Sequence, residues 1–520
     1  MSSVTASSSS PATRQALETA EFLSRLDDQA EGLARLEGKH PLLSGGGTVA
    51  VVSDLHLAEG RLKGGTYRGT ENFFADEAFG RFLQSLRTRV PPGSPAALLV
   101  INGDFVDFLR ITRVPAHDQP TTADLVDWQN LLSRIGLPWS LEDLQRSITR
   151  KEDRFGLKTH PHKSAWKLAV AVQGHRPVFA ALAEWLAAGH RLAIVSGNHD
   201  LEWYWKPVRD CLRLVLAGLA SGDAVTNLRR FSGQLVFSHE GFTIDNRLAI
   251  EHGHRFDRFS RVIGGPTFGG PQELNIPFGS FFNRYLLNRI EQSYPFLDNV
   301  RPHPAILPFL MRQRFPLALR LLFQHVPFML RIIPKKYYAY VLRRTLWFFA
   351  AVLGPLIAVV FLLGRELSTF IGPTSSSGSE PLTGWLGGLG VKVVRDASWL
   401  VGSYVLSQVV AWLQLREPAD LDEPARRLLR QNPEWRILTM GHTHNPSHLR
   451  QGEQVYFNTC TWIDIVEITS GELRLDCANL FLQVSPGSDG HAGEGSLWRW
   501  NDDAGRAEPA VVVTRRLDDA

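Results

Sequence analysis

The sequence predicts an α/β fold that is interrupted by one long insertion. Short apolar runs, typical of buried strands, alternate with helix-like segments over residues 49–251, and the alternation resumes at residue 436. A polar block follows the last apolar residue of most of these runs. Because α/β sheets keep their sites at the carboxyl ends of strands, these blocks are predicted to share one edge of a sheet.

Length and composition limit the number of domains and the broad class of protein. The chain has 520 residues, enough for more than one domain, and 21% charged with 44% hydrophobic residues predict that most of it folds. A net charge of +4 and a pI near 9.0 allow an anionic partner without distinguishing nucleic acid from phospholipid headgroups. The cysteines lack CxxC spacing and are too few for a disulfide framework, which fits a reducing compartment: Cys211, Cys460 and Cys477.

The N-terminal region, residues 1–45, is predicted to be a disordered tail followed by a helix. Its first residues, MSSVTASSSSPATRQ, have neither a basic start nor an apolar run, so no signal peptide is expected. Apolar residues at helical spacing over 15–36 predict an amphipathic helix that packs on the body. The glycines at 45–47 precede a strand and lack a following Lys-Ser/Thr pair, which favours a flexible entry over a phosphate-binding loop.

The remaining elements follow from hydrophobic periodicity. Residues 111–163 are weakly periodic and are predicted to be an excursion with short helices. The segment 486–520 is Gly- and Asp-rich and is predicted to be a C-terminal tail that contributes one strand at most. Predicted strands are 49–52, 97–101, 192–195, 247–251, 436–440, 454–458, 464–468, 472–476 and 510–514, and predicted helices are 75–86 and 167–188.

Five polar blocks carry residues that can bind a metal or transfer a proton. One such block is a weak signal, because a lone histidine or a GDxxD string after a strand is more often structural. Five blocks, each after an apolar strand, are hard to explain as core packing. They are SDLHL at 53–57, NGDFVD at 102–107, GNHD at 197–200, HGH at 252–254 and GHTH at 441–444.

Seven donors in these blocks form a candidate ligand set for two divalent ions. Two ions need about this many nitrogen and oxygen donors, with one carboxylate able to bridge. The D-x-H and H-x-H spacings suit an extended strand end, in which residues i and i+2 point the same way. Mn, Fe and Zn all accept this mixture, and Mn is our first expectation. The donors are Asp54, His56, Asp104, Asn198, His252, His442 and His444.

The five blocks resemble the motifs of the calcineurin-like metallophosphoesterases. The resemblance covers roughly residues 48–110, 165–258 and 436–465, less than half of the chain. It implies a four-layer α/β/β/α sandwich with a dimetal site. It further implies that one metal binds Asp54, His56 and His444, that the other binds Asn198, His252 and His442, and that Asp104 bridges them.

The resemblance also implies roles for neighbouring residues. His199 would donate a proton near the leaving group and would be oriented by Asp200. The segment FNTCTW at 457–462 is similar to the family's Asn-Thr-Gly-Thr/Ser-Trp strand, with Cys460 where glycine is usual. We interpret Cys460 as a small buried thiol rather than a catalytic one.

Other histidines are expected to lie outside the ligand set. His254 would steady His252 without binding metal. Histidines beyond the five blocks are expected to be ordinary surface or core residues, among them His160, His162 and His239.

The ligand set predicts hydrolysis of a phosphate ester or pyrophosphate bond. Two metals about 3.5–4 Å apart lower the pKa of a bridging water toward neutrality, generate hydroxide and clamp the phosphoryl oxygens for in-line attack. His199 would then stabilise or protonate the leaving oxygen as a general acid. Monoesters, diesters and pyrophosphates are all compatible with this chemistry.

The insertion, predicted at 261–432 and mainly helical, divides the domain into a first part at 46–260 and a second part at 433–485. Two uncharged stretches within it, 345–364 and 397–415, have the length of membrane spans. The second half of the ligand set must rejoin the first, so the chain has to return to the side that it left. This leaves two spans, no span, or a shallow re-entrant hairpin.

Charge around these stretches favours one orientation. Arginine and lysine are frequent on the body side of both stretches and scarce between them, so the positive-inside rule places the body in the cytoplasm. Residues 308–344 mix basic and apolar side chains, as interfacial helices do. The alternative is a soluble helical cap whose apolar faces bury each other.

Three functions are compatible with the sequence. The first is a hydrolase at the cytoplasmic face of a membrane that acts on an amphiphilic substrate, such as a phospholipid or a lipid-linked pyrophosphate. The UDP-2,3-diacylglucosamine pyrophosphatase branch of the family also acts on an amphiphilic substrate of this kind. No nucleic acid partner is expected. The second is a soluble phosphatase or phosphodiesterase for nucleotides or phosphoproteins, with the insertion as a protein-interaction cap. The third is a metal-binding scaffold without activity.

Overall fold

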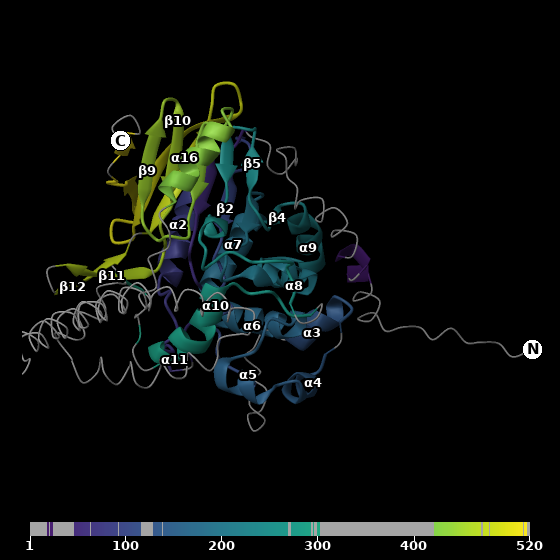
Figure 1. The fold of residues 1–520 in the computed structure, drawn as a ribbon. Coiled ribbons are helices and arrows are strands. Elements are labelled where there is room, and N and C mark those ends of the chain that lie inside the picture. The colour runs from purple at the N-terminus through teal and green to yellow at the C-terminus, as the bar shows by residue number, and fades with distance from the viewer. Residues whose placement is uncertain are drawn as a thin grey trace, which may run out of the picture. The chain divides into compact units, whose positions relative to one another are not determined.

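Two mixed β-sheets carry the fold, and a third, smaller sheet adjoins them (Figure 1). The seven-stranded sheet contains, from edge to edge, β15 (Arg506–Pro509), β14 (Ala492–Asn501), β13 (Leu480–Pro486), β1 (Val49–Val52), β2 (Leu98–Asn102), β3 (Arg191–Val195) and β4 (Leu235–Ser238). The six-stranded sheet contains β16 (Thr514–Arg516), β9 (Ser447–Gln451), β10 (Gln454–Asn458), β8 (Ile437–Met440), β6 (Leu248–Ile250) and β5 (Phe242–Ile244). The third consists of β12 (Glu472–Cys477), β11 (Asp464–Thr469) and β7 (Val300–Arg301).

Helices connect these strands. Between β1 and β4 they are α2 (Asp76–Arg89), α3 (Trp128–Arg134), α4 (Leu141–Arg146), α5 (Arg150–Phe155), α6 (Pro161–Gly174), α7 (Arg176–Ala187), η3 (Leu201–Tyr204), α8 (Lys206–Leu219) and α9 (Ala224–Ser232). After β6 they are η4 (His254–Phe256), α10 (Phe278–Phe282), the π-helical turn η5 (Asn283–Leu287), α11 (Asn288–Glu291) and α16 (Asp422–Gln431). The predicted α/β class is therefore confirmed.

The structure, a computed structural model, divides the chain into two compact units, residues 1–300 with 418–520, and residues 301–417. The second unit falls almost entirely outside the described residues, and the predicted spans 345–364 and 397–415 lie there. Within the described ranges, no helix combines the length and hydrophobicity that crossing a bilayer requires. The described residues are 18–19, 21–23, 46–62, 64–91, 93–115, 128–137, 139–268, 272–292, 295, 299–301, 421–469, 472–477, 479–512 and 514–516.

Buried side chains from alternate positions of the central strands enter two different cores. In β1, Val49 and Val51 face a core shared with the six-stranded sheet, whereas Ala50 and Val52 face a core shared with helices. This two-sided burial explains why β1, β2 and β3 are continuous apolar runs rather than alternating ones. A third cluster joins the outer face of the six-stranded sheet to Leu421, Ala425 and Leu429 at α16.

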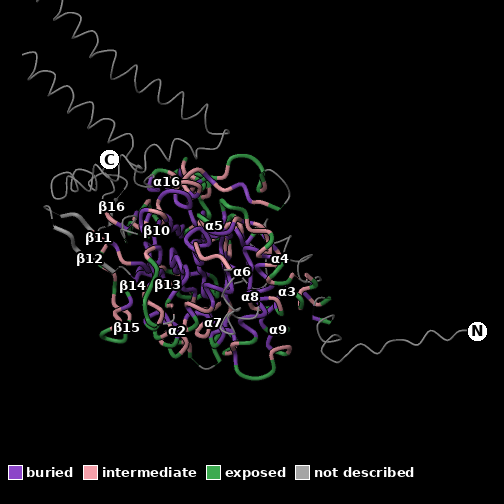
Figure 2. Tube along the Cα trace, turned by 90° about the horizontal axis from the view of Figure 1, so that it is seen from below, coloured by how far each residue is buried: buried purple, intermediate pink, exposed green. Residues whose placement is uncertain are grey.

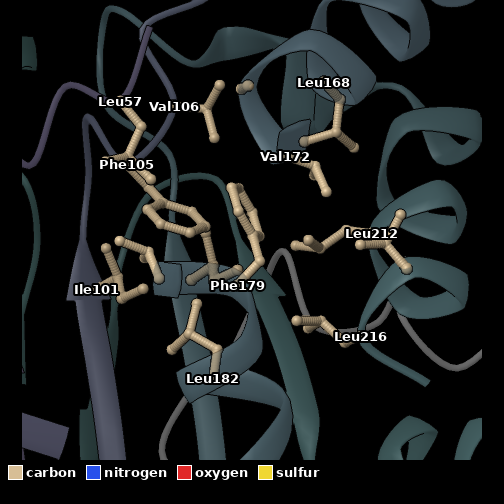
Figure 3. Close-up of a cluster of buried hydrophobic side chains, with 14 of the residues drawn as sticks. Leu57, Ile101, Phe105, Val106, Leu168, Val172, Phe179, Leu182, Leu212 and Leu216 are labelled. Atoms are coloured by element: carbon tan, nitrogen blue, oxygen red, sulfur yellow. The ribbon is translucent and has the colours of Figure 1, made fainter. Parts of the chain in front are cut away.

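The helix-side core is shown in Figure 3. Leucine, valine and phenylalanine side chains from α6, α7 and α8 meet the side chains of β2 and of the segment after it. Phe105 and Phe179 lie at its centre with ring centroids 5.6 Å apart. Buried residues occupy the interior of the unit and exposed ones its peripheral loops and helix surfaces (Figure 2). Burying each such side chain contributes about 1.5–3 kcal/mol, so this core holds α6–α8 on the sheet.

Parallel pairing brings the strand ends together. Strands β1 to β4 pair in parallel, with Val52 opposite Ile101 and Asn102 opposite Val195. In the other sheet, β6, β8 and β10 also pair in parallel, with Ile250 opposite Thr439. The polar blocks that follow these strands therefore emerge at the same edge of each sheet.

Two predicted elements differ from the structure. The single helix predicted at 167–188 is two helices, α6 and α7, which meet at His175. Pro177 stands in the first turn of α7, where a proline is tolerated because that N–H has no helical partner. The predicted tail at 486–520 instead supplies β14 and β15, which extend the seven-stranded sheet, and β16, at the edge of the six-stranded one. Glycines and charged residues in these strands interrupt the alternation of apolar and polar residues, so the sequence did not predict them as strands.

The predicted limits of the insertion, 261–432, are too wide. Helices α10, α11 and α16 belong to the first unit, and the separate unit begins only at residue 301 and ends at residue 417. At the N-terminus, residues 18–19 and 21–23 are helical and Leu23 is buried in the helix-side core, while the rest of the predicted tail and helix lies outside the described residues.

His175, at the junction of α6 and α7, predicts a pH-dependent stability. Its Nδ1 lies 2.9 Å from Asp76 and its Nε2 lies 3.3 Å from Glu71. Burial alone would lower the pKa of His175, but these two carboxylates raise it to about 9. A folded-state pKa above the unfolded value of about 6.5 means that the stabilisation is complete below about pH 6.5. It is then lost as the pH rises through about 9.

We therefore expect His175→Gln to reduce the free energy of unfolding by about 3 kcal/mol more at pH 6 than at pH 10. Urea denaturation at the two pH values measures this difference. His491→Gln, at a site whose side chain is 53% exposed, is the control and should change little at either pH. An equal loss at both pH values for His175→Gln would contradict a charged histidine.

Candidate metal centre

The two sheets are joined by hydrogen bonds at the edge where the polar blocks emerge. The backbone N–H of His442 donates to both carboxylate oxygens of Asp54, at 3.2 and 3.0 Å. The side-chain amide of Asn102 donates to the carbonyl of Glu251 at 2.8 Å. Blocks that are far apart in the sequence therefore meet in one place.

The first group of donors consists of Asp54, His56 and His444. Asp54 Oδ1 lies 3.2 Å from His444 Nε2 and 3.9 Å from His56 Nε2, and the two Nε2 atoms are 3.1 Å apart. Donor atoms that each lie about 2.0–2.2 Å from one ion are about 3 Å from each other. This group could therefore hold a metal ion.

The second group consists of Asp104, His252 and His442. His252 Nδ1 donates to the carbonyl of Asn102 at 2.8 Å, so its Nε2 carries the lone pair, 3.3 Å from Asp104 Oδ2. His442 Nε2 lies 3.3 Å from Asp257 Oδ2, which leaves Nδ1 for the cluster. Such outer hydrogen bonds orient histidine ligands in metal sites.

Asp104 lies between the two groups. Its Oδ2 is 3.3 Å from His252 Nε2 and 3.7 Å from His56 Nε2, so one carboxylate oxygen faces both. Within the described residues, the buried Oδ1 of Asn198 has no hydrogen-bond partner, and the buried Nε2 of His252 faces only the Asp104 carboxylate, without hydrogen-bond geometry. Buried polar atoms are costly without a partner, and a cation would supply one to each. The donor set thus fits a bound metal ion.

Most of these ligand residues have a left-handed backbone. The φ values are 54° for Asp54, 52° for His56, 51° for Asp104, 68° for His442 and 52° for His444. Each such residue other than glycine costs about 1–3 kcal/mol, and such strain clusters at functional sites. The expected extended geometry of D-x-H and H-x-H is wrong, because the strands end at Val52 and Met440 and these residues form sharp turns after them.

Two glycines in the blocks allow the close approach of the chain. A Cβ on Gly197 would lie 2.1 Å from Asp104 Oδ1, and one on Gly441 would lie 2.3 Å from Asp54 Oδ2. Any side chain at either position would displace a candidate ligand. The glycines in GNHD and GHTH therefore allow the backbone to pack against carboxylates in the turns after β2 and β1.

His199 is oriented by Asp107, and the predicted orienting role of Asp200 is wrong. His199 Nδ1 donates to Asp107 Oδ2 at 2.8 Å. Asp200 turns the other way and accepts from the N–H groups of Gly197, at 2.6 Å, and Phe105, at 2.8 Å. Asp200 thus shapes its own loop, whereas the imidazole of His199 pairs with Asp107 in the loop after β2.

Asp107 also holds the metal-binding candidate His56. His56 Nδ1 donates to Asp107 Oδ2 at 2.9 Å, which leaves its Nε2 for the first group. The sequence prediction missed Asp107, although it is the last residue of NGDFVD. The sequence does show a second carboxylate three residues after Asp104. This spacing indicates a partner for the histidines only once the turn between the two aspartates is known.

Charge and burial shift the titration of these groups. Burial opposes ionisation of Asp107, but His199 and His56 hold the pKa of its carboxyl well below the usual value. Burial alone would lower the pKa of His199, but Asp107 and Asp104 raise it to about 9. Burial and the charge of Asp104 raise the pKa of Asp200 to about 7. Asp107 and Asp104 therefore favour the protonated form of His199, the form that a general acid requires.

His254 and Cys460 lie beside the ligands. The ring of His254 packs beside that of His252, with centroids 5.4 Å apart, whereas Asn102 and Asp104 face the ring nitrogens of His252. Cys460 is buried with φ 59°, which explains why glycine suits this position, and its thiol donates to the carbonyl of His444 at 3.3 Å. The thiol thus packs behind a ligand.

The histidines predicted to lie outside the site form other contacts. His160 and His162 stack on Trp139, with ring centroids 5.4 and 4.3 Å from it. His239 Nδ1 lies 3.2 Å from Ser196 Oγ. None of the metal-binding groups found among the described residues includes these three.

Comparison with known proteins adds no family assignment. No protein-family model matches the chain, and the search of curated proteins found no match.

We expect Gly441→Ala to weaken metal binding. The new methyl group would clash with Asp54 Oδ2, so the affinity for Co²⁺, followed by visible absorption, should fall at least roughly tenfold, as when the support of a ligand is lost. Overpacking should also cost about 1–3 kcal/mol of stability. Gly218→Ala in α8 is the control, because no described atom beyond the neighbouring residues and nearby backbone of the same helix lies within 4 Å of its added Cβ. A folded Gly441→Ala protein with unchanged Co²⁺ affinity would rule out this geometry.

Proposed function

We propose that the chain is a metal-dependent phosphoesterase of the calcineurin-like type, with a four-layer α/β/β/α core. The observation that carries the proposal is the position of Asp104, whose Oδ2 faces both donor groups. A carboxylate between two sets of histidines suits a pair of divalent ions, for which Mn is the first candidate and Fe and Zn are alternatives. The helix layers against each sheet support the sandwich.

The ligands divide into two sets around Asp104. One ion would be held by Asp54, His56 and His444, and the other by Asn198, His252 and His442. When bound, such ions polarise a phosphoryl oxygen and activate a water for in-line attack. The buried surroundings strengthen these electrostatic interactions, because few water molecules screen them.

The chain itself supplies the proton for the leaving group. His199 is 13% exposed and is the least buried partner of Asp107, so its ring can reach a substrate oxygen. Its Nδ1–H bond to Asp107 leaves Nε2–H as the proton to be donated. Asp107 holds the ring in this orientation and stabilises its positive charge, as the carboxylate partner of a catalytic histidine does.

For the substrate we propose an amphiphilic phosphate compound, a phospholipid or a lipid-linked pyrophosphate, bound at the cytoplasmic face of a membrane. This rests on the two uncharged stretches and the basic segment before them. The connection to the site is close in sequence, because the segment that contains them starts after His252 and ends before His442. A soluble phosphatase for nucleotides or phosphoproteins is the alternative.

We expect the full-length protein to hydrolyse p-nitrophenyl phosphate or bis(p-nitrophenyl) phosphate with Mn²⁺ and to lose this activity with a chelator. His199→Gln and Asp107→Asn should each lower kcat roughly 10²- to 10⁴-fold, because both remove the oriented proton donor. Asp200→Asn should act mainly on stability. His162→Gln is the control, since its ring stacks on Trp139 away from the site.

Turnover that survives both metal removal and His199→Gln would exclude this mechanism. Tight Mn²⁺ binding without turnover on aryl phosphates, phospholipids or lipid pyrophosphates would instead favour a metal-binding scaffold.

We expect the full-length protein to stay with membranes through a high-salt wash and an alkaline carbonate wash. Apolar insertion resists both treatments, whereas electrostatic attachment does not resist salt. Release by either wash would argue against an integral segment. Nucleotides and phosphopeptides would then be the substrates to test first.

A further inference from the structure

Asp107 is the shared hydrogen-bond partner of His56 and His199, and the guanidinium of Arg110 also faces it. Arg110 Nε lies 3.3 Å from Asp107 Oδ2, the oxygen that both histidines contact. The backbone N–H of Arg110 donates to the other oxygen at 3.2 Å. Both side chains are buried, with 1% and 0% exposure. An ion pair from the guanidinium and a hydrogen bond from the backbone of Arg110 therefore both reach the carboxylate that orients the two imidazoles.

Glu291, from a distant segment, holds Arg110 in turn. The Glu291 carboxylate is fully buried and pairs with Arg110 Nη1. A buried guanidinium with a single carboxylate partner would be poorly compensated for its lost hydration, and breaking a buried pair is strongly destabilising. Asp107, Arg110 and Glu291 thus form a continuous buried chain of charges that ends at His199 and His56.

The segment that carries Glu291 is tied to the loops of the site. Ser280 Oγ in α10 donates to the carbonyl of the candidate ligand Asn198 at 2.9 Å. Asn288 Nδ2 in α11 donates to the carbonyl of Leu109, next to Arg110, at 2.7 Å. Between them lies the π-helical turn η5, a distortion that is frequent at functional sites. Residues 278–291 therefore contact two of the five blocks or their immediate neighbours.

We propose that Arg110 and Glu291 are positioning residues, through which segment 278–291 sets the orientation of His56 and His199. For His199 the inference rests on the proposed function, because it concerns the orientation of the proton donor. For His56 it requires only that the metal site exists. Neither residue touches the reacting atoms. Both act through Asp107, whose carboxylate moves if the guanidinium leaves it.

The test combines metal binding with kinetics in the full-length protein. Arg110→Met and Glu291→Gln should each raise the Kd for Co²⁺ roughly tenfold, the size typical of groups that orient a metal ligand. They should lower kcat on p-nitrophenyl phosphate by a similar factor or more, with KM nearly unchanged. Arg110→Lys should recover part of both losses, because it keeps the charge without the planar fork.

A double-mutant cycle separates positioning from general stability. If Arg110 acts through Asp107, its substitution should have little further effect once Asp107 is changed. The Arg110→Met/Asp107→Asn double variant should therefore differ from Asp107→Asn alone by less than about threefold in Kd and in kcat. The matched control is Arg213→Met, which breaks another buried i,i+3 pair, Arg213 with Asp210, 2.8 Å apart in α8. It should lower stability while leaving Kd and kcat unchanged.

The outcomes are distinct. Folded Arg110→Met or Glu291→Gln proteins with wild-type Kd and kcat would overturn the inference, as would fully additive effects with Asp107→Asn. If Arg110→Met does not fold, Glu291→Gln decides, because it keeps the size of the side chain while removing the charge that pairs with the guanidinium. If the wild-type protein binds Co²⁺ but hydrolyses no phosphate compound, the proposed function fails, and the Kd values still decide the positioning of His56.

Discussion

Three carboxylates buried at one edge of the sheets are the constraint on which the rest of the structure depends. Asp54, Asp104 and Asp107 are each no more than 1% exposed. Buried negative charges are expensive unless cations or hydrogen bonds compensate them. Imidazoles contact all three, Arg110 contacts the third, and the first two each belong to a group of donors that could hold a metal ion. The site is therefore a network of mutually compensating charges, and no single member can be removed at low cost.

The fold supplies this network through strand register and turns. Parallel strands of both sheets end together, and the ligands occupy the sharp turns that follow rather than the strands themselves. Left-handed turns cost energy, and the sheets on either side of them provide the rigid support that maintains such strain. Gly197 and Gly441 permit carboxylates from other strands to pass directly beside the backbone. The turns that carry the candidate ligands are thus strained in their backbone and also tightly packed against neighbouring carboxylates.

The central strands and the meeting of the five blocks could be predicted from the sequence, because continuous apolar runs and parallel pairing leave few alternatives. β1 and β10 have the predicted bounds, 49–52 and 454–458. The partner of His199 could not be predicted, since Asp104, Asp107 and Asp200 all belong to the polar blocks and any of them could face the ring. His199 pairs with Asp107 because the carboxylate of Asp200 already accepts hydrogen bonds from the N–H groups of Gly197 and Phe105. The pairing of Arg110 with Glu291 spans 181 residues and leaves no periodic signal.

The central claim is that Asp104 joins two metal ions in one site. Electron paramagnetic resonance of the protein loaded with two equivalents of Mn²⁺ tests it most directly, because a bridging carboxylate holds the ions close enough for exchange coupling. The account predicts a coupled dimanganese signal that Asp104→Asn abolishes in a folded protein. Only the six-line signal of isolated Mn²⁺ in the wild-type protein, or coupling that persists in Asp104→Asn, would contradict it.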